Sequence, residues 1–394
     1  MTGQIKQRVQ AIDTARGIIM IIMALDHVRD YFHVHAVDQR PTDLTTTTPL
    51  LFFTRWITHF CAPTFLFLSG ISAYLVGMRK TKKQLSGFLI KRGLWLIVAD
   101  ATIMTFGLTF DPHFDVIFML VLWSIGLSMI ILGLMVHTPP VAIILTGAII
   151  VFGHNIFDYF PVPDTTAWGQ VFKFLVTISS GGIPIAGRVV VTSYAAITCC
   201  GLMLLGYGAG QLYNAQLFTA KQRTRILFYI GAGAVLLFIV LRTINHYGDP
   251  SPAMPQKDAM FGLLSFFNAT KNPMSLDFMC MTIGPSLLLL AAVDSLQNSF
   301  TKFVSVYGKV PLFYFIVHIY FIHILVVIVF FASGHGMKDI ADPKGGFYFR
   351  PANFGYGLWV VYLLWAFVVL VLYKPCRWFY NYKATHKYWW LSYI

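Results

Sequence analysis

Residues 12–30 read IDTARGIIMIIMALDHVRD, a long apolar run that carries regularly placed charges. Several of its polar and polarisable residues recur every three or four positions: Asp13, Arg16, Met20, Met23, His27 and Asp30. That spacing places them on one stripe of a helix, whose other positions are mainly Ile, Met, Ala and Leu. A charged group facing lipid costs at least ~2.5 kcal/mol, so we expect the stripe to face the interior of a helical bundle.

The composition of the whole chain is that of a membrane protein. Of its 394 residues, 57% are hydrophobic and 11% are charged, and the mean hydropathy is +0.67. A soluble chain usually carries roughly 25% charged residues. The composition also excludes disorder and a small disulfide scaffold. Because the apolar runs are far longer than strands, the predicted fold class is all-α, a polytopic helical membrane protein.

About ten apolar runs are long enough to cross ~30 Å of hydrocarbon. They lie near 12–33, 49–77, 93–110, 115–136, 141–160, 188–213, 226–245, 275–293, 310–332 and 356–373. Loops on the N-terminal side hold 17 Lys and Arg in 79 residues, whereas the opposite loops hold 7 in 98. Positive residues stay cytoplasmic, so both termini are predicted to be cytoplasmic. The net charge of +13 then reflects orientation beside anionic lipids, and no nucleic-acid partner is expected.

The chain reads as a single integral membrane domain, 1–394, without internal repeats. The apolar segment 168–187 contains Lys173 and a Ser-Ser-Gly-Gly run, which favours a re-entrant or interfacial helix over a span. The five cysteines form no C-x-x-C pair, and no H-x-x-x-H pair lies in a predicted span. We therefore expect neither a disulfide framework nor a metal site.

Histidines recur in the predicted outer halves of three spans. His27 lies 14 residues after Asp13, roughly 21 Å along a helix at ~1.5 Å per residue. Arg55 and His59 are four residues apart and share a face, and His323 is expected at a similar depth. A functional role is favoured for His27 over that of an interfacial side chain.

Other charged and polar residues in the spans leave alternatives open. Asp13 and Arg16 form either a ligand site or a buried ion pair between helices. For His318 a bond to a backbone carbonyl in the core is favoured. Asp100 and Arg242 are candidates for a pair across helices.

Lys91 and Arg92 open the third span at its cytoplasmic end. Two cations at a helix start beside a pore would suit a phosphorylated ligand. The alternative is an ordinary cytoplasmic anchor of the span, which the pair alone favours.

The first span resembles the opening of the integral-membrane acyltransferase type 3 family. That family begins with Asp-x-x-Arg-Gly and a later His, which correspond here to Asp13, Arg16, Gly17 and His27. Its second helix ends in Ser-Gly, matched by Ser69 and Gly70. Its basic motif at the third helix is only partly matched, by Lys91-Arg92.

A closer resemblance is to the bacterial branch similar to heparan-α-glucosaminide N-acetyltransferase, and it runs over nearly the whole chain. The segments that carry it are 24–30 (ALDHVRD), 43–48 (DLTTTT), 55–63 (RWITHFCAP), 247–250 (YGDP), 267–273 (FNATKNP) and 308–313 (GKVPLF). The resemblance implies transfer of acetyl, or another acyl group, from cytoplasmic acetyl-CoA or acyl-CoA to a sugar amine or hydroxyl at the far face. It places the protein in a bacterial cytoplasmic membrane, with the bilayer, acyl-CoA and a glycan or other small acceptor as partners. A homo-oligomer remains open.

Acyl transfer needs a base for the attacking group and donors for the oxyanion. Under this resemblance His27 is the base, with Asp26 or Asp30 orienting it. The predicted oxyanion donors are Arg55, His59 or His323. The CoA-binding residues are predicted to be Asp13, Arg16, Ser69, Lys91 and Arg92.

Two other classes of function stay open. Intramembrane Asp, Arg and His also mark ion-coupled permeases, although no matched pair of broken helices supports one here. A catalytically inactive homologue acting as a membrane assembly protein is the other alternative.

Overall fold

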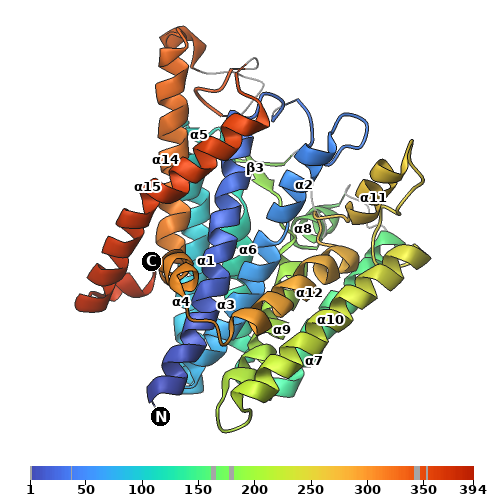
Figure 1. Ribbon diagram of the computed structural model, residues 1–394, viewed down its shortest axis with the longest axis vertical. Coiled ribbons are helices and arrows are strands. Elements are labelled where there is room, and N and C mark those ends of the chain that lie inside the picture. Colours follow the sequence, from blue (N-terminus) through green and yellow to red (C-terminus); the bar gives the residue numbers. More distant parts are fainter. Residues whose placement is uncertain (1, 37, 161–165, 177–181, 341–346, 352–353) are drawn as a thin grey trace.

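The computed structural model is a helical bundle in which α1 runs through the middle, with α14 and α15 on one side and α7 and α10 on the other (Figure 1). It describes residues 2–36, 38–160, 166–176, 182–340, 347–351 and 354–394. The α-helices are α1 (Thr2–Phe32), α2 (Pro49–Thr58), α3 (Cys61–Gly77), α4 (Lys82–Ala99), α5 (Thr105–Thr109), α6 (Val121–Met135), α7 (Pro140–Gly153), α8 (Ala167–Leu175), α9 (Ala196–Ala209), α10 (Ala220–Ile244), α11 (Ala259–Phe267), α12 (Leu276–Val293), α13 (Ser299–Lys309), α14 (Pro311–Ala332) and α15 (Leu358–Thr385). Short π or 3-10 turns are η1 (Asp100–Met104), η2 (His154–Asp158), η3 (Gly210–Tyr213), η4 (Met337–Asp339) and η5 (Trp389–Ser392).

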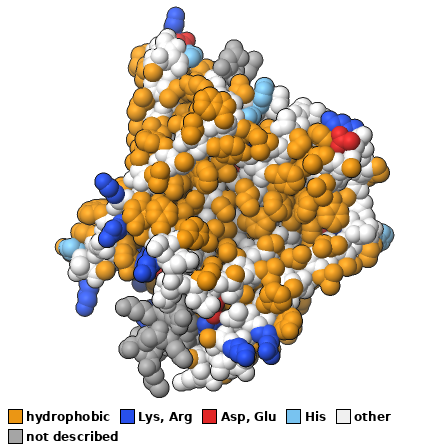
Figure 2. Space-filling view, in the orientation of Figure 1, with side chains coloured by type: hydrophobic (Ala, Val, Ile, Leu, Met, Phe, Trp, Pro, Cys, Tyr) orange, Lys and Arg blue, Asp and Glu red, His pale blue; other side chains and the backbone are white. Residues whose placement is uncertain are grey.

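Every predicted apolar run contains a helix, which confirms the polytopic helical class. Among the described residues, seven helical segments are long and apolar enough to cross a membrane. They are Pro49–Gly77, Pro140–Asp158, Ala196–Tyr213, Ala220–Ile244, Leu276–Val293, Pro311–Ala332 and Leu358–Thr385. The other predicted spans fall on α1 and α4, which carry several charges, and on the 15-residue α6. The count of ten spans and the cytoplasmic termini stay predictions. A broad band of apolar side chains crosses one face, with Lys and Arg at its margins (Figure 2).

Two predicted spans begin as strands instead of helices. β1 (Val116–Met119) pairs in parallel with β3 (Arg188–Thr192), and β2 (Ile183–Ile185) pairs with β3 antiparallel. The expectation of helix from 115 and from 188 was wrong at these positions. β1 reads Val-Ile-Phe-Met and β3 reads Arg-Val-Val-Val-Thr, and such β-branched and aromatic residues favour strands. Hydropathy alone does not separate a short apolar strand from a helix.

The predicted span 49–77 is two helices, α2 and α3, that meet at His59 and Phe60. Pro63 lies in the first turn of α3 and has no N–H to donate to the carbonyl of His59, so the hydrogen-bond ladder is interrupted there. The segment 168–187 contains α8, whose nine residues are far too short to span. Its Ser-Ser-Gly-Gly run, 179–182, lies largely outside the described residues.

Asp100 and Arg242 do not pair with each other. The Asp100 Oδ2 accepts hydrogen bonds from the backbone N–H groups of Leu120 and Trp123, both at 2.7 Å, and so caps the start of α6. The guanidinium of Arg242 instead binds carbonyls of the segment between α10 and α12.

Glycines bring the central helices into close contact. A Cβ on Gly308 of α13 would lie 1.9 Å from the carbonyl oxygen of Asp13, and one on Gly17 would lie 1.9 Å from that of Val304. The two glycines therefore let α1 and α13 cross with their backbones in contact, the small-residue packing typical of membrane helices.

Candidate active site

A cavity of about 90 Å³ lies beside the C-terminal half of α1, and we call it the His27 cavity. Its polar walls come from α1, α2, α3, η1, the segment before α9 and the loop before α12. These residues are Asp26, His27, Thr58, Cys61, Asp100, Tyr194 and Lys271. The space has room for a small group or a few water molecules.

His27 is held by a second histidine. Its Nδ1 lies 2.6 Å from Nε2 of His318, and the Nδ1 of His318 lies 2.8 Å from the carbonyl oxygen of Tyr314. A carbonyl only accepts, so Nδ1 of His318 carries the proton, and its Nε2 accepts from Nδ1–H of a neutral His27. The Nε2 of His27 is thereby left with a lone pair. This is the nitrogen that a general base uses.

The predicted carbonyl bond of His318 is confirmed, but the sequence missed its contact with His27. His318 is fully buried on α14, and its ring stacks on His27 with centroids 4.9 Å apart. The predicted orienting role of Asp26 or Asp30 therefore competes with a contact that already occupies Nδ1 of His27.

Asp26 links two arginines. Its Oδ1 lies 2.8 Å from Arg29, and its Oδ2 pairs with Arg55, which also bonds Thr58 at 3.2 Å. The half-exposed Asp30 pairs with Arg29 at 2.5 Å. This network fixes α2 against α1, next to the His27 cavity. Among the described residues that line the cavity, Asp26 is present, whereas Arg55 and Asp30 are not.

The other two predicted histidines lie outside the His27 cavity. His59 is buried, and its ring lies 5.2 Å from that of Phe278. The ring nitrogens of His323 lie 3.0 and 3.1 Å from the carbonyl oxygens of Gly107 and Tyr348. His323 thus ties α14 to α5 and to the loop that contains Tyr348.

A second cavity, of about 280 Å³, lies toward the N-terminal end of α1. We call it the Arg16 cavity. Four of its lining residues are basic, from α1, α4, α13 and α15: Arg16, Arg92, Lys309 and Lys383. Three residues line both cavities: Phe65, Val121 and Phe315. The two cavities are therefore neighbours that share a wall, with cations at one end and His27 at the other.

Arg16 is oriented by three partners. It donates to Ser72 Oγ at 2.7 Å and to the carbonyl oxygen of Gly308 at 3.2 Å, and it pairs with Asp13 at 3.5 Å. Of the predicted CoA-binding residues, the structure brings Arg16, Ser69 and Arg92 to this cavity. Asp13 lies behind Arg16 as its counter-ion, whereas Lys91 is exposed and is not among the lining residues.

The sequence prediction missed several lining residues. The sequence predicts Lys309 and Lys383 only as cytoplasmic charges and Lys271 as an outer-loop residue, whereas all three line the cavities. Lys271 does lie in the FNATKNP segment that carries the family resemblance, which was the available signal. No group of three His, Cys, Asp or Glu that could hold a metal ion occurs within the part of the chain that the structure describes.

Fold and cavities define a multi-pass membrane protein with a basic internal vestibule that adjoins a small histidine-containing chamber. Residues 8–247, more than half of the chain, match the family model of the heparan-alpha-glucosaminide N-acetyltransferase catalytic domain. The chain belongs to this family, and it is therefore a multi-pass membrane acyltransferase. The family in general uses acetyl-CoA as donor. No curated protein matches the chain.

Proposed function

We propose that this protein transfers a short acyl group, in the first place acetyl, from cytoplasmic acyl-CoA to an amine or hydroxyl of a sugar or other small acceptor at the outer face of a bacterial cytoplasmic membrane. The observation that carries the proposal is the shared wall of the two cavities. One end offers Arg16, Arg92, Lys309 and Lys383, and the other end offers His27.

The Arg16 cavity suits the phosphates of CoA. Arginine binds phosphate in a bidentate manner, and lysine supplies compact positive charge. The distance along α1 from Arg16 to His27 is about 16 Å at ~1.5 Å per residue, a span that suits an extended pantetheine arm. The arm would pass the wall formed by Phe65, Val121 and Phe315.

The His27 cavity suits the reaction. His27 Nε2 accepts the proton of the acceptor N–H or O–H while that atom attacks the thioester carbonyl carbon. The C–S bond then breaks, and the leaving thiolate takes the proton from the imidazolium of His27. A cavity of about 90 Å³ suits an acetyl group. The charge asymmetry of the loops supports a donor at the cytoplasmic end and an acceptor outside.

The test uses purified protein in proteoliposomes with acetyl-CoA and D-glucosamine, and it measures release of the CoA thiol and acetylation of the amine. His27→Ala and His27→Asn should abolish turnover while acetyl-CoA binding persists. Asn keeps a donor toward His318 but has no basic nitrogen. His246→Ala is the matched control, because its side chain is exposed on the outer surface.

Full turnover by His27→Ala would contradict the proposal. Binding of acetyl-CoA without any turnover by the wild type would favour an inactive homologue. Uptake of D-glucosamine into the vesicles without acetylation would favour a permease.

A further inference from the structure

Lys271 projects into the His27 cavity from the loop between α11 and α12. It lines the same space of about 90 Å³ as His27. Its Nζ lies 5.5 Å from the ring centroid of Tyr194. Among the described residues, the ammonium has neither an ion-pair partner nor a hydrogen-bond acceptor. Removing a cation from water without a partner is costly, so a lysine kept for stability alone would be expected to pair with a carboxylate.

The backbone that carries Lys271 is fixed by Asp249. The backbone N–H and the hydroxyl of Thr270 each donate to the Asp249 carboxylate at 2.7 Å. The hydroxyl of Ser275 donates to the same carboxylate at 2.7 Å, and the N–H of Ser275 bonds the carbonyl of Thr270 at 3.0 Å. The residues on both sides of Lys271 are thus held in place.

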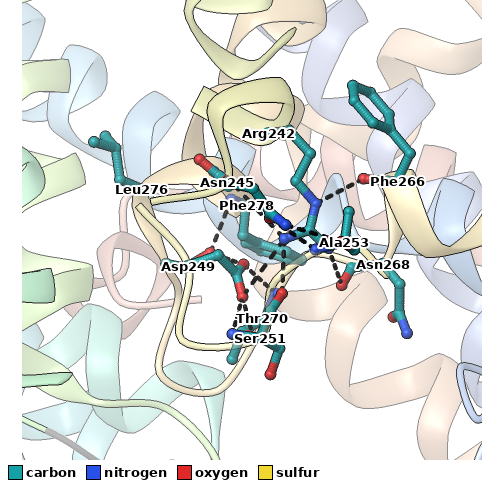
Figure 3. Close-up of polar contacts among 12 residues, drawn as sticks. Arg242, Asn245, Asp249, Ser251, Ala253, Phe266, Asn268, Thr270, Leu276 and Phe278 are labelled. Atoms are coloured by element: carbon teal, nitrogen blue, oxygen red, sulfur yellow. Dashed lines mark hydrogen bonds and ion pairs between the residues drawn. The ribbon is translucent and has the colours of Figure 1, made fainter. Parts of the chain in front are cut away.

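Arg242 fixes the outer part of the same loop, as Figure 3 shows. Its guanidinium lies 3.9 Å from Asp249 and donates to four backbone carbonyls at 2.8 to 3.1 Å. These carbonyls belong to Ser251, Ser265, Phe266 and Asn268. A buried arginine and a buried aspartate therefore hold the loop rigid, so Lys271 keeps its position before a ligand arrives.

A cation and a candidate general base that line one small cavity both face the group that occupies it. During acyl transfer the negative charge that develops next to the attacked carbon is on the carbonyl oxygen. Of the other residues predicted to stabilise this charge, Arg55 pairs with Asp26 and His323 contacts two carbonyls. His59 does not line the cavity.

We propose that Lys271 is a catalytic residue whose ammonium donates a hydrogen bond to the carbonyl oxygen of the acyl group as it becomes an oxyanion. The inference rests on the proposed function. When the acceptor atom adds to the carbonyl carbon, the π electrons of the C=O bond move onto the oxygen beside Lys271. They re-form the C=O bond when the C–S bond breaks. Lys271 keeps its proton throughout, and His27 makes the proton transfers.

The test compares Lys271→Met and Lys271→Ala with the wild type, using acetyl-CoA with D-glucosamine and, separately, with water as acceptor. Loss of one oxyanion donor typically lowers kcat by about 10²–10³-fold. Acetyl-CoA binding should change by less than about threefold, because the four basic residues of the Arg16 cavity are untouched. Lys257→Met is the matched control: Lys257 is exposed and belongs to the same outer segment.

Chemical rescue separates a catalytic from a structural role. Added ethylamine should raise the turnover of Lys271→Ala by a factor at least ten times larger than its effect on the wild type. Turnover of Lys271→Met within threefold of the wild type would overturn the inference and leave the proposed function intact. Loss of turnover without rescue, together with a lowered melting temperature, would assign Lys271 a structural role and also overturn the inference. Failure of the proposed function is seen separately, as an active His27→Ala or an inactive wild type.

Discussion

Nδ1 of His27 lies 2.6 Å from Nε2 of His318, and this contact decides which nitrogen of His27 is left free for the proposed role as base. Because His318 donates its own proton to the carbonyl of Tyr314, it presents a lone pair to His27. Under the proposed function His318 is therefore a positioning residue, and it holds the tautomer of His27 that leaves Nε2 basic.

Removing the hydrogen-bond acceptor at position 318 should lower the rate of acyl transfer, because His27 then loses the contact that holds its tautomer. We expect His318→Leu, which fills a similar volume without a lone pair, to reduce kcat by about 10- to 100-fold with little change in KM for acetyl-CoA. His318→Gln keeps an amide oxygen that can accept from His27, so it should recover much of the loss. Equal rates for the Leu and Gln variants would contradict a tautomer role.

The cations of the Arg16 cavity should control donor affinity. Arg92→Ala is expected to weaken acetyl-CoA binding by about tenfold, which corresponds to ~1.4 kcal/mol, a reasonable loss for one charge-assisted contact. Lys91→Ala is the neighbouring control: Lys91 is exposed, and Arg92 lines the cavity. Titration of acetyl-CoA into nanodisc-embedded protein measures both. An equal loss of acetyl-CoA affinity in the two variants would contradict donor binding in the Arg16 cavity.

The contact of α1 with α13 should tolerate no added methyl group. Gly308→Ala would place Cβ 1.9 Å from the carbonyl of Asp13, and the helices must separate to relieve the clash. Overpacking of this kind costs about 1–3 kcal/mol, so the melting temperature should fall. Gly87→Ala is the control, because a Cβ there meets nothing within 4 Å and alanine favours a helix. An unchanged melting temperature in Gly308→Ala would show that the helices can separate without loss.

The sequence predicted the helical positions well, because hydropathy reports burial in lipid directly. It failed where local composition is ambiguous. The runs at 116–119 and 188–192 are apolar enough for a helix, yet they pair with each other. The break between α2 and α3 was readable from Pro63, whereas the strand pairing depends on contacts between distant parts of the chain.

The same contrast between local signals and long-range contacts applies to the site. The stripe on α1 located His27 and Arg16, because helical spacing is a local property. Lys271 was missed, because its place depends on Asp249 and Arg242, more than twenty residues earlier in the chain. Lys383 reaches the Arg16 cavity from α15, at the opposite end of the sequence. Such long-range placements leave no periodic signal.

The orientation of the protein can be tested by labelling. All five native cysteines are buried, so a single introduced cysteine should dominate the signal. Gln39→Cys and Gln256→Cys are expected to react with an impermeant thiol reagent added to intact cells. Gln216→Cys, on the predicted cytoplasmic side, should react only after lysis. The reverse pattern would invert the topology and place the Arg16 cavity outside.

The pH dependence should report the charge of Lys271. Burial, and next to it the positive charge of Arg55, lower the pKa of Lys271 to about 8, against the opposite influence of Asp26 and Asp30. The titratable or charged groups around it are Asp26, His27 and Asp30 of α1, Arg55 of α2, His59, Cys61 of α3, Asp100 of η1 and Tyr194. Only the protonated amine can donate to an oxyanion, so the contribution of Lys271 is present below pH 8 and is lost above it.

The Lys271→Arg variant isolates this loss of rate above pH 8, because a guanidinium stays charged throughout the range. The ratio of wild-type to Lys271→Arg turnover cancels titration of the acceptor amine. It should be constant below about pH 7 and fall by about tenfold per pH unit above pH 8, as the neutral fraction of Lys271 grows. Stopped assays with acetyl-CoA and D-glucosamine between pH 6 and pH 10 measure it. A ratio that stays flat across this range would show that the charge of Lys271 does not contribute to the rate.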